Sequence, residues 1–324
     1  RKPIMITGLI GYTVGTVLFT SVFYAGMTGL LSGTLLYVIL LITRCCQSIV
    51  MSATGPASAA YAADHTSRDE RTKTMARLGT ANSMGTILGP AVSGALATFG
   101  LLAPLYFAAA LAAAAAMVVW RKLPVTPDAQ HTNRKSSRKL RYTDKRITLL
   151  LITAVGLFIG FSSIQQTLGF QLQDKLHLSG IETAQMTGAA LLVCATFTFL
   201  TQITVMQRLQ LRPTQFVRIG LLFMLIGAAV ISGFETFMVL SVGMAFLGIG
   251  MALCMPSIAA GASLAVSTEE QGAAAGLVSS CPAIGFAIGP ICAGGLYQYH
   301  TALAPLFSTG VLFIVLVVLV INDR

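Results

Sequence analysis

The sequence predicts an all-α polytopic membrane protein built from two helical bundles, and three observations lead to this prediction. Of the 324 residues, 55% are hydrophobic and only 10% are charged, whereas soluble domains carry about 25% charged residues. Apolar stretches recur from end to end of the chain, and about 20 apolar residues in a helix span about 30 Å of hydrocarbon. An internal repeat also relates the two halves of the chain. Together these features exclude an ordinary soluble domain.

Ten apolar stretches are predicted to be transmembrane helices. They cover residues 4–26, 33–63, 74–98, 101–120, 147–171, 183–207, 214–233, 236–266, 271–296 and 301–321. The first is too long for a signal peptide and has no cleavage site after a short core. The six cysteines all fall within these stretches without the spacing of zinc or redox sites, so we interpret them as small hydrophobic residues. We expect no metal site and no cofactor.

The net charge of +10 follows the topology of the predicted helices. Of the 21 Lys and Arg residues, 19 lie at the chain start, in the connections after the second, fourth, sixth and tenth spans, or just inside the flanking helices. Cytoplasmic loops of membrane proteins carry such an excess, so both ends of the sequence are expected in the cytoplasm. A nucleic-acid partner is not expected, because the charge forms no single basic face.

A basic polar segment divides the chain into two parts. Residues 121–146 hold nine Lys and Arg against two Asp, with two prolines and no apolar period. Such a composition is typical of a flexible cytoplasmic linker. We therefore predict an N-terminal bundle at 1–120 with four spans, a linker at 121–146, and a six-helix bundle at 147–324.

The internal repeat aligns residues 51–94 with residues 251–294 without a gap, at an offset of 200 and with 11 identities in 44 positions. The identities include special residues, namely Pro56 with Pro256, Ser67 with Ser267, Glu70 with Glu270, Gly85 with Gly285, Gly89 with Gly289, Pro90 with Pro290 and Gly94 with Gly294. Both copies lead from a charged loop into a glycine-rich helix, so the repeats are parallel, which is one known transporter plan. If the halves are equivalent, two further helices are expected in front of Arg1.

Three motifs resemble the major facilitator superfamily in its twelve-helix drug:proton antiporter branch. "RKP" at 1–3 is similar to the tail of the signature GxLaDRxGRKP. "RCCQS" at 44–48 resembles the fourth-helix pattern RxxQG, and "GTILGPAVSG" at 85–94 resembles the antiporter signature GxxxGPxxGG. The resemblance implies the major facilitator fold, with the ten spans as family helices three to twelve of an N-terminally truncated chain.

The glycine motif has two interpretations that do not exclude each other. Small residues recur every four positions in both copies, and close helix packing in lipid favours such a ridge. The proline removes a backbone donor and tends to kink the helix. The resemblance implies that the first copy lies between the halves and seals the transporter against leak. The motif residues are Gly85, Gly89, Pro90 and Gly94, with Gly285, Gly289, Pro290 and Gly294 as their counterparts.

Arg44 is the most unusual single residue of the predicted spans. It lies about eleven residues into the second one, where a central arginine costs about 2.5 to 3.5 kcal/mol on insertion scales. We therefore expect it to face a cavity or a partner, with snorkelling to the interface as the alternative. Gln47 lies three residues on, on nearly the same face. The resemblance implies that Arg44, with Gln47 beside it, takes part in proton coupling.

Polar residues within other spans are candidates for the lining of a substrate cavity. The fifth span contains "GFSSIQQTLGFQLQDKL", in which one helical face is polar. Hydrogen bonding between helices is the alternative role for each polar side chain, and Tyr12 could instead pack or face lipid. The candidates are Ser162, Gln165, Gln166, Gln202, Asn82 and Tyr12.

The motifs predict a transporter and argue against an enzyme. The sequence has no GxSxG, HExxH or Walker motif, so neither a hydrolase nor an ATP-driven pump is expected. The resemblance implies a monomeric secondary transporter of a bacterial inner membrane, which exports small amphipathic organic compounds by alternating access and uses the proton gradient. A dedicated metabolite or siderophore exporter, a uniporter or importer, and a transport-inactive truncated protein remain alternatives.

Overall fold

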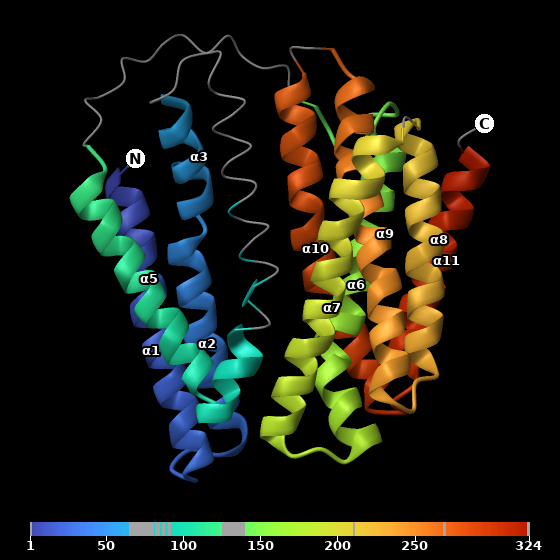
Figure 1. Cartoon of the computed structure of the whole chain (residues 1–324). Coiled ribbons are helices and arrows are strands. Elements are labelled where there is room, and N and C mark those ends of the chain that lie inside the picture. Colours follow the sequence, from blue (N-terminus) through green and yellow to red (C-terminus); the bar gives the residue numbers. More distant parts are fainter. Residues whose placement is uncertain are drawn as a thin grey trace. The chain divides into compact units, whose positions relative to one another are not determined.

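The computed structural model describes residues 2–64, 81, 85, 88–89, 92–124, 140–209, 211–267 and 270–322. All regular structure within these ranges is helical, and nine of the helices there are long and apolar enough to cross a membrane. The chain divides into two compact units, Arg1–Thr132 and Asn133–Arg324 (Figure 1). Helices are the expected solution for an open chain in lipid, because each helix satisfies its own backbone hydrogen bonds. The predicted all-α membrane fold is confirmed.

Unit 1 is organised around its first helix. The helices of this unit whose bounds lie within the described residues are α1 (Lys2–Met27), α2 (Gly33–Met51), α3 (Thr54–Asp64), the short η1 (Ala97–Phe99) and α5 (Ala103–Lys122). α1 packs against α5 and α2 along most of their lengths, and against α3 at one end. α1 therefore carries the contacts that hold these helices together.

The predicted span at 33–63 is broken in two. α2 ends at Met51, and α3 begins at Thr54 after a turn at Ser52. Pro56 follows at once and has no backbone N–H, so the carbonyl of Ser52 lacks its helical donor. The apolar run continues through the break, since residues 33–58 still qualify as one candidate span. Most of the third predicted span, 74–98, lies outside the described residues.

The described part of unit 2 contains six long helices, which correspond to the last six predicted spans. They are α6 (Thr148–Leu176), α7 (Gly180–Arg208), α8 (Pro213–Ser232), α9 (Phe237–Leu264), α10 (Gln271–Tyr297) and α11 (Leu303–Asn322). Their ends follow local chemistry. Ser179 and Glu182 form a capping box at the start of α7, and Pro213 is the first residue of α8, where its missing N–H costs nothing.

Close packing in unit 2 depends on glycines that face each other. A Cβ at Gly220 of α8 would lie 2.9 Å from the carbonyl oxygen of Gly250 in α9, and one at Gly227 would lie 2.7 Å from that of Gly243. Small residues let helices approach closely, which membrane helices need because lipid supplies no hydrophobic drive between them. The core of the unit is formed by fully buried side chains, which include Leu157, Leu221 and Leu247.

Candidate functional site

A polar network lies between α1 and α2 in the middle of unit 1. Gln47 of α2 is only 4% exposed, and its Nε2 donates to Thr16 Oγ1 at 2.6 Å and to the carbonyl oxygen of Tyr12 at 3.3 Å. The Thr16 hydroxyl in turn donates to the Tyr12 carbonyl at 2.7 Å. A buried amide needs such partners, because an unpaired one costs its full desolvation penalty. The network therefore fixes the orientation of the Gln47 side chain.

Gly15 creates the space that Gln47 occupies. A Cβ at Gly15 would lie 2.8 Å from the Gln47 Cβ and 2.9 Å from its Cγ, which is closer than real carbon contacts allow. Sequence reasoning missed Gly15 and Thr16. The small residues Gly8, Gly11 and Gly15 in "GLIGYTVG" could have indicated that α1 packs closely on a neighbour, but not on which one.

Arg44 is attached to this network from the outside. Its Nη1 donates to Gln47 Oε1 at 2.8 Å, and its guanidinium carbon lies 5.4 Å from the centre of the Phe19 ring, within the range of a cation–π contact. The rest of the side chain is exposed. Because Arg carries five N–H donors and Gln47 accepts from one nitrogen, the outer face of the guanidinium has further donors for an anion or a carboxylate. The sequence predicted the shared face of Arg44 and Gln47, and the structure brings the two side chains into direct contact.

Tyr12 joins the network through its backbone. Its carbonyl oxygen accepts from both Gln47 and Thr16, and its side chain is half-buried. The hydrogen bonds of the network therefore fix the backbone of α1 at Tyr12. The other polar candidate of the N-terminal half, Asn82, lies outside the described residues, as does Pro90.

On α6, the two neighbouring serines serve helix packing. Ser162 is fully buried and donates to the carbonyl oxygen of Gly285 in α10 at 3.0 Å. Ser163 donates to the carbonyl oxygen of Gly289 at 3.2 Å. The prediction that Ser162 lines a cavity is therefore corrected, because its hydroxyl is enclosed between two helices. The alternative role, hydrogen bonding between helices, is the one observed.

The glutamines of α6 and α7 lie in different surroundings. Gln165 of α6 is half-buried, and its Oε1 is enclosed without a hydrogen-bond partner among the described residues. The hydroxyl of Thr187 in α7 is also enclosed and has no partner among these residues. A Cβ at Gly169, one turn beyond Gln165, would lie 3.6 Å from that hydroxyl. Unpaired polar atoms at one helix contact favour a bound water or a polar ligand group there. Gln166 is exposed and Gln202 is half-buried.

The two copies of the glycine motif have different surroundings. In α10, a Cβ at Gly285 would lie 2.2 Å from the Phe158 Cβ, and one at Gly289 would lie 2.1 Å from Ser162 Oγ. In unit 1, a Cβ at Gly85 or Gly89 would meet no described atom within 4 Å. The second copy is therefore a tight contact between α6 and α10.

The remaining motif glycines lie at the end of each copy. Gly94 is buried. A Cβ at Gly294 has no described neighbour within 4 Å, and Pro290 lies inside α10 without ending it.

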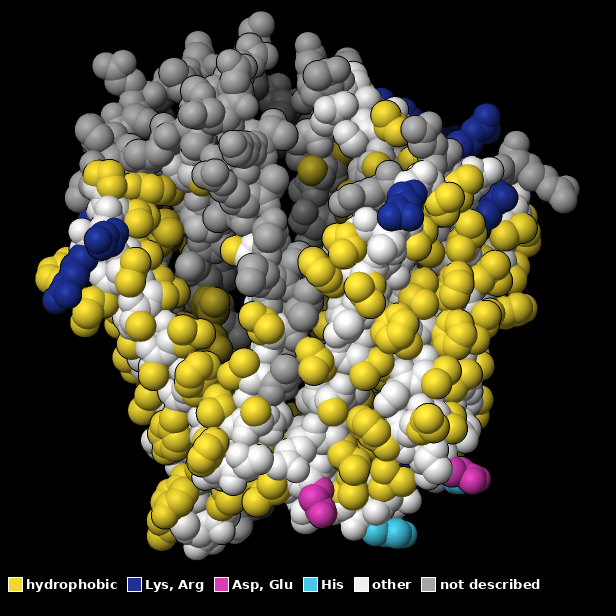
Figure 2. Space-filling model, in the orientation of Figure 1, with side chains coloured by type: hydrophobic (Ala, Val, Ile, Leu, Met, Phe, Trp, Pro, Cys, Tyr) yellow, Lys and Arg dark blue, Asp and Glu magenta, His cyan; other side chains and the backbone are white. Residues whose placement is uncertain are grey.

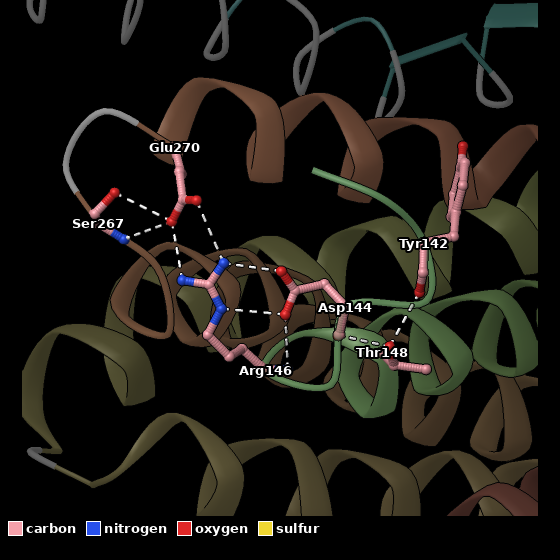
Figure 3. Close-up of polar contacts among 6 residues, drawn as sticks. All are labelled: Tyr142, Asp144, Arg146, Thr148, Ser267 and Glu270. Carbon is pink, nitrogen blue, oxygen red and sulfur yellow. Dashed lines mark hydrogen bonds and ion pairs between the residues drawn. The ribbon is translucent and has the colours of Figure 1, made fainter. Parts of the chain in front are cut away.

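Contacts at three levels join α6 and α10, the first of them through residues directly before each helix. At one end, Arg146 Nη1 donates to Glu270 Oε2 at 2.9 Å, and Arg146 also pairs with Asp144 at 2.8 Å (Figure 3). The serine contacts described above lie in the middle. At the other end, the Tyr297 phenol donates to the Asp174 carboxylate.

Asp144, Arg146, Ser267 and Glu270, which we call the Arg146 cluster, lie directly before α6 and α10. Glu270 accepts from the Ser267 backbone N–H at 3.3 Å and from its hydroxyl at 3.1 Å (Figure 3). The guanidinium of Arg146 lowers the pKa of the Asp144 carboxyl and, together with Ser267, that of Glu270. The matching of Ser267 and Glu270 to Ser67 and Glu70 was the sequence signal for this cluster.

The described part of the chain contains no group of three or more His, Cys, Asp or Glu side chains that could hold a metal ion. Each cysteine in that part is a free thiol. The α1–α2 network itself offers hydrogen bonding and charge pairing by Arg44, Gln47 and Thr16.

Comparison with known sequences relates the chain to transporters. It matches the profile of the Major Facilitator Superfamily over residues 1–281 and 211–324. Multidrug resistance protein 2 of Bacillus subtilis (strain 168) is 24% identical over 329 residues, which cover 97% of this chain and 77% of the relative. Multidrug resistance protein 1 of the same organism is 24% identical over 315 residues, which cover 95% of this chain and 76% of the relative.

Solved structures agree with this relationship at the level of the fold. A bacterial homologue of the human lysosomal transporter Spinster superposes with a TM-score of 0.73 at 12% identity, covering 99% of this chain and 82% of that one. The nucleoside transporter NupG superposes with a TM-score of 0.71 at 14% identity, covering 100% of this chain and 87% of that one. The predicted family and fold are thus confirmed: the chain belongs to the Major Facilitator Superfamily and is an integral membrane transporter.

Proposed function

We propose that this protein is a proton-coupled exporter that moves small amphipathic organic compounds, drug-like in character, by alternating access between two helical bundles. The observation that carries the proposal is the network in which the buried amide of Gln47 holds the guanidinium of Arg44. The two Bacillus subtilis relatives named for multidrug resistance support the substrate class.

Arg44 contributes a fixed positive charge to the proposed coupling. An arginine side chain stays protonated at every physiological pH, so it does not carry the transported proton itself. It responds instead to the protonation of an acidic group that competes for its outer N–H donors. Coupling requires that this protonation weakens substrate binding in one of the two states. Gln47 has a positioning role, because it holds the guanidinium in one place.

The residues that we propose as substrate contacts carry aromatic or amide groups, and each unit contributes its own candidates. Tyr12 lies in unit 1, and Gln165, Gln166 and Gln202 lie in unit 2. The unpaired Oε1 of Gln165 supports a ligand or water contact on α6. Substrate pockets in proteins are mostly apolar with a few placed polar groups, which suits an amphipathic compound.

The distribution of charge supports the proposed orientation in a bacterial inner membrane, with both ends of the sequence in the cytoplasm. In unit 2, Arg141, Lys145 and Arg212 lie at one end, while Asp174 and Glu235 lie at the opposite end. Figure 2 shows this separation on the visible face of unit 2, with Lys and Arg at one end and acidic and His side chains at the other. The positive-inside rule assigns the basic end to the cytoplasm.

Transport by the purified protein in liposomes tests the proposal. We expect a fluorescent amphipathic dye to move against its gradient when protons flow in the opposite direction, and a protonophore to abolish this movement. Arg44→Gln should largely abolish proton-driven movement, because it removes a coupling that typically changes binding affinity about 5–150-fold, while dye binding persists. Arg141→Gln, an exposed arginine outside the helices, is the matched control.

Three results would contradict specific parts of the proposal. Proton-driven transport that survives in Arg44→Gln removes Arg44 from the mechanism. Movement of the dye along the proton gradient, in the same direction as protons, excludes an exporter. Proton-driven transport of a metabolite but of no dye favours the dedicated metabolite exporter instead.

A further inference from the structure

A hydrophobic groove runs along the surface of unit 1 between α1 and α5, with a volume of about 470 Å³. Its walls are almost entirely apolar. The side chains that form them include Ile6, Ile10 and Val14 of α1, with Ala113, Met117 and Trp120 of α5. Several are well exposed, among them Trp120 at 62%. The polar networks described above do not use this face.

The length of the groove suits one leaflet of a bilayer. At 1.5 Å per residue, Ile6 and Val14 lie about 12 Å apart along the α1 axis. Half of the hydrocarbon core is about 15 Å deep, since the whole core is about 30 Å thick. The groove is therefore about as long as the part of an acyl chain that lies in one leaflet.

The groove ends at a cluster of positive charge. Lys2 begins α1, and Arg121 and Lys122 end α5 directly after Trp120. Lys2 Nζ donates to the carbonyl oxygen of Trp120 at 2.7 Å, so the start of α1 and the end of α5 are in contact. Figure 2 shows dark blue Lys or Arg side chains at this end of unit 1, above a yellow hydrophobic surface.

This charge is not balanced by the helices that carry it. Neither α1 nor α5 contains an Asp or Glu residue, and Arg121 and Lys122 are exposed. A ligand that fits both the apolar groove and the basic cluster at its end is therefore an amphiphile with an apolar tail and a negatively charged head. Trp120 lies at the junction, as tryptophans commonly do at the depth of lipid headgroups.

We propose that the groove between α1 and α5 is a binding site for an anionic phospholipid, with an acyl chain in the groove and the phosphate held by Lys2, Arg121 and Lys122. Basic sites next to transmembrane helices attract anionic headgroups. A second copy of the chain suits the face less well. A two-fold contact through it would place the same three cations of each copy near each other, because such contacts pair identical surfaces.

Lipid-dependent thermal unfolding of the purified full chain in detergent tests the site. The probes are phosphatidylglycerol and phosphatidylcholine with identical acyl chains, so that only the headgroup charge differs. We expect phosphatidylglycerol to raise the unfolding temperature saturably and at lower concentration than phosphatidylcholine. The double variant Arg121→Gln, Lys122→Gln should weaken phosphatidylglycerol binding by about tenfold or more, since each cation near a membrane surface contributes about fivefold.

Matched variants separate the groove from its surroundings. Ala113→Phe fills the groove, whereas Ala114→Phe places the same side chain on the neighbouring exposed position outside it. Only the first should abolish the lipid response. Met117→Trp and its neighbour Val118→Trp, at exposed positions, repeat the comparison if Ala113→Phe does not fold. Arg141→Gln with Lys145→Gln controls for the loss of two charges elsewhere.

The remaining outcomes overturn the proposal. Equal responses to the two lipids would show that the basic cluster recognises no headgroup. Equal lipid responses of Ala113→Phe and Ala114→Phe, or of the Trp pair, would show that the groove binds no acyl chain. A change of oligomeric state in Ala113→Phe without a change in lipid response would identify a second copy as the occupant.

Discussion

The side-chain amide of Gln47 donates to the hydroxyl of Thr16 at 2.6 Å, and this hydrogen bond joins α2 to α1 at a fully enclosed position. The same amide accepts from Arg44 through its oxygen. Thr16 is therefore a positioning residue for Arg44, although the two side chains do not touch in the described network.

Replacement of Thr16 by Val should loosen this arrangement. The variant keeps the shape of the side chain but leaves Gln47 Nε2 with only the longer bond to the Tyr12 carbonyl. An incompletely paired buried donor costs about 1–3 kcal/mol, so we expect a lower unfolding temperature and a shifted pH profile of transport. Thr43→Val is the control, since that hydroxyl donates to Leu40 of its own helix. Identical pH profiles of Thr16→Val and the wild type would rule out the positioning role.

Gly15→Ala should displace Gln47 by steric conflict. The new Cβ would lie 2.8 Å from the Gln47 Cβ, and overpacking of this kind typically costs about 1–3 kcal/mol. Proton-driven transport should fall together with the unfolding temperature. Gly310→Ala in α11 is the matched control, because its Cβ meets no described atom within 4 Å. The steric argument fails if both variants behave alike.

Gly289→Ala should destabilise unit 2, whereas Gly294→Ala should not. At Gly289 the Cβ would lie 2.7 Å from the carbonyl oxygen of Ile159 and 2.1 Å from Ser162 Oγ, and at Gly294 it meets no described atom within 4 Å. The backbone carbonyl cannot move aside alone, so α6 and α10 must separate. Thermal unfolding in detergent compares the two variants directly. A wild-type unfolding temperature in Gly289→Ala would contradict the close packing seen here.

Acidification should open the Arg146 cluster. Arg146 lowers the folded-state pKa of Asp144 and Glu270, so their stabilisation is fully present above the ordinary values of about 3.9 and 4.3. It is lost as the pH falls below those values through the lowered pKa of the folded state. Proteolysis of the loop between α9 and α10 at decreasing pH measures the opening.

Glu270→Gln provides the test of this pH dependence. It should make the loop more susceptible at neutral pH and flatten its response to acid. The exposed carboxylate of Glu235, replaced by Gln, is the control. An unchanged acid response in Glu270→Gln would show that the opening depends on other groups.

Hydropathy was sufficient to predict the long helices of the described residues, because lipid requires long apolar stretches and helical hydrogen bonding. The last six predicted spans agree with α6 to α11 to within a few residues at most ends, although α7 starts at Gly180 and α6 continues to Leu176. The break between α2 and α3 was not predicted, because the hydrophobic run continues through it. Pro56 was its sequence signal.

The partners of the polar side chains could be predicted only within one helix. Arg44 and Gln47 are three residues apart, so helical geometry alone places them together. Thr16 is 31 residues from Gln47, and its contact depends on how α1 lies against α2. Ser162 was misassigned for the same reason: a serine on a polar helical face suits a cavity or a neighbouring carbonyl equally, and only the position of α10 distinguishes them.

The three levels of contact between α6 and α10 have a mechanical consequence. A slide of one helix along the other by a single turn, about 5.4 Å, would break the Arg146–Glu270 pair, the serine hydrogen bonds and the Tyr297–Asp174 bond at the same time. These two helices are therefore locked in register. When unit 2 changes shape during a transport cycle, we expect α6 and α10 to keep their register and to move together as one rigid pair.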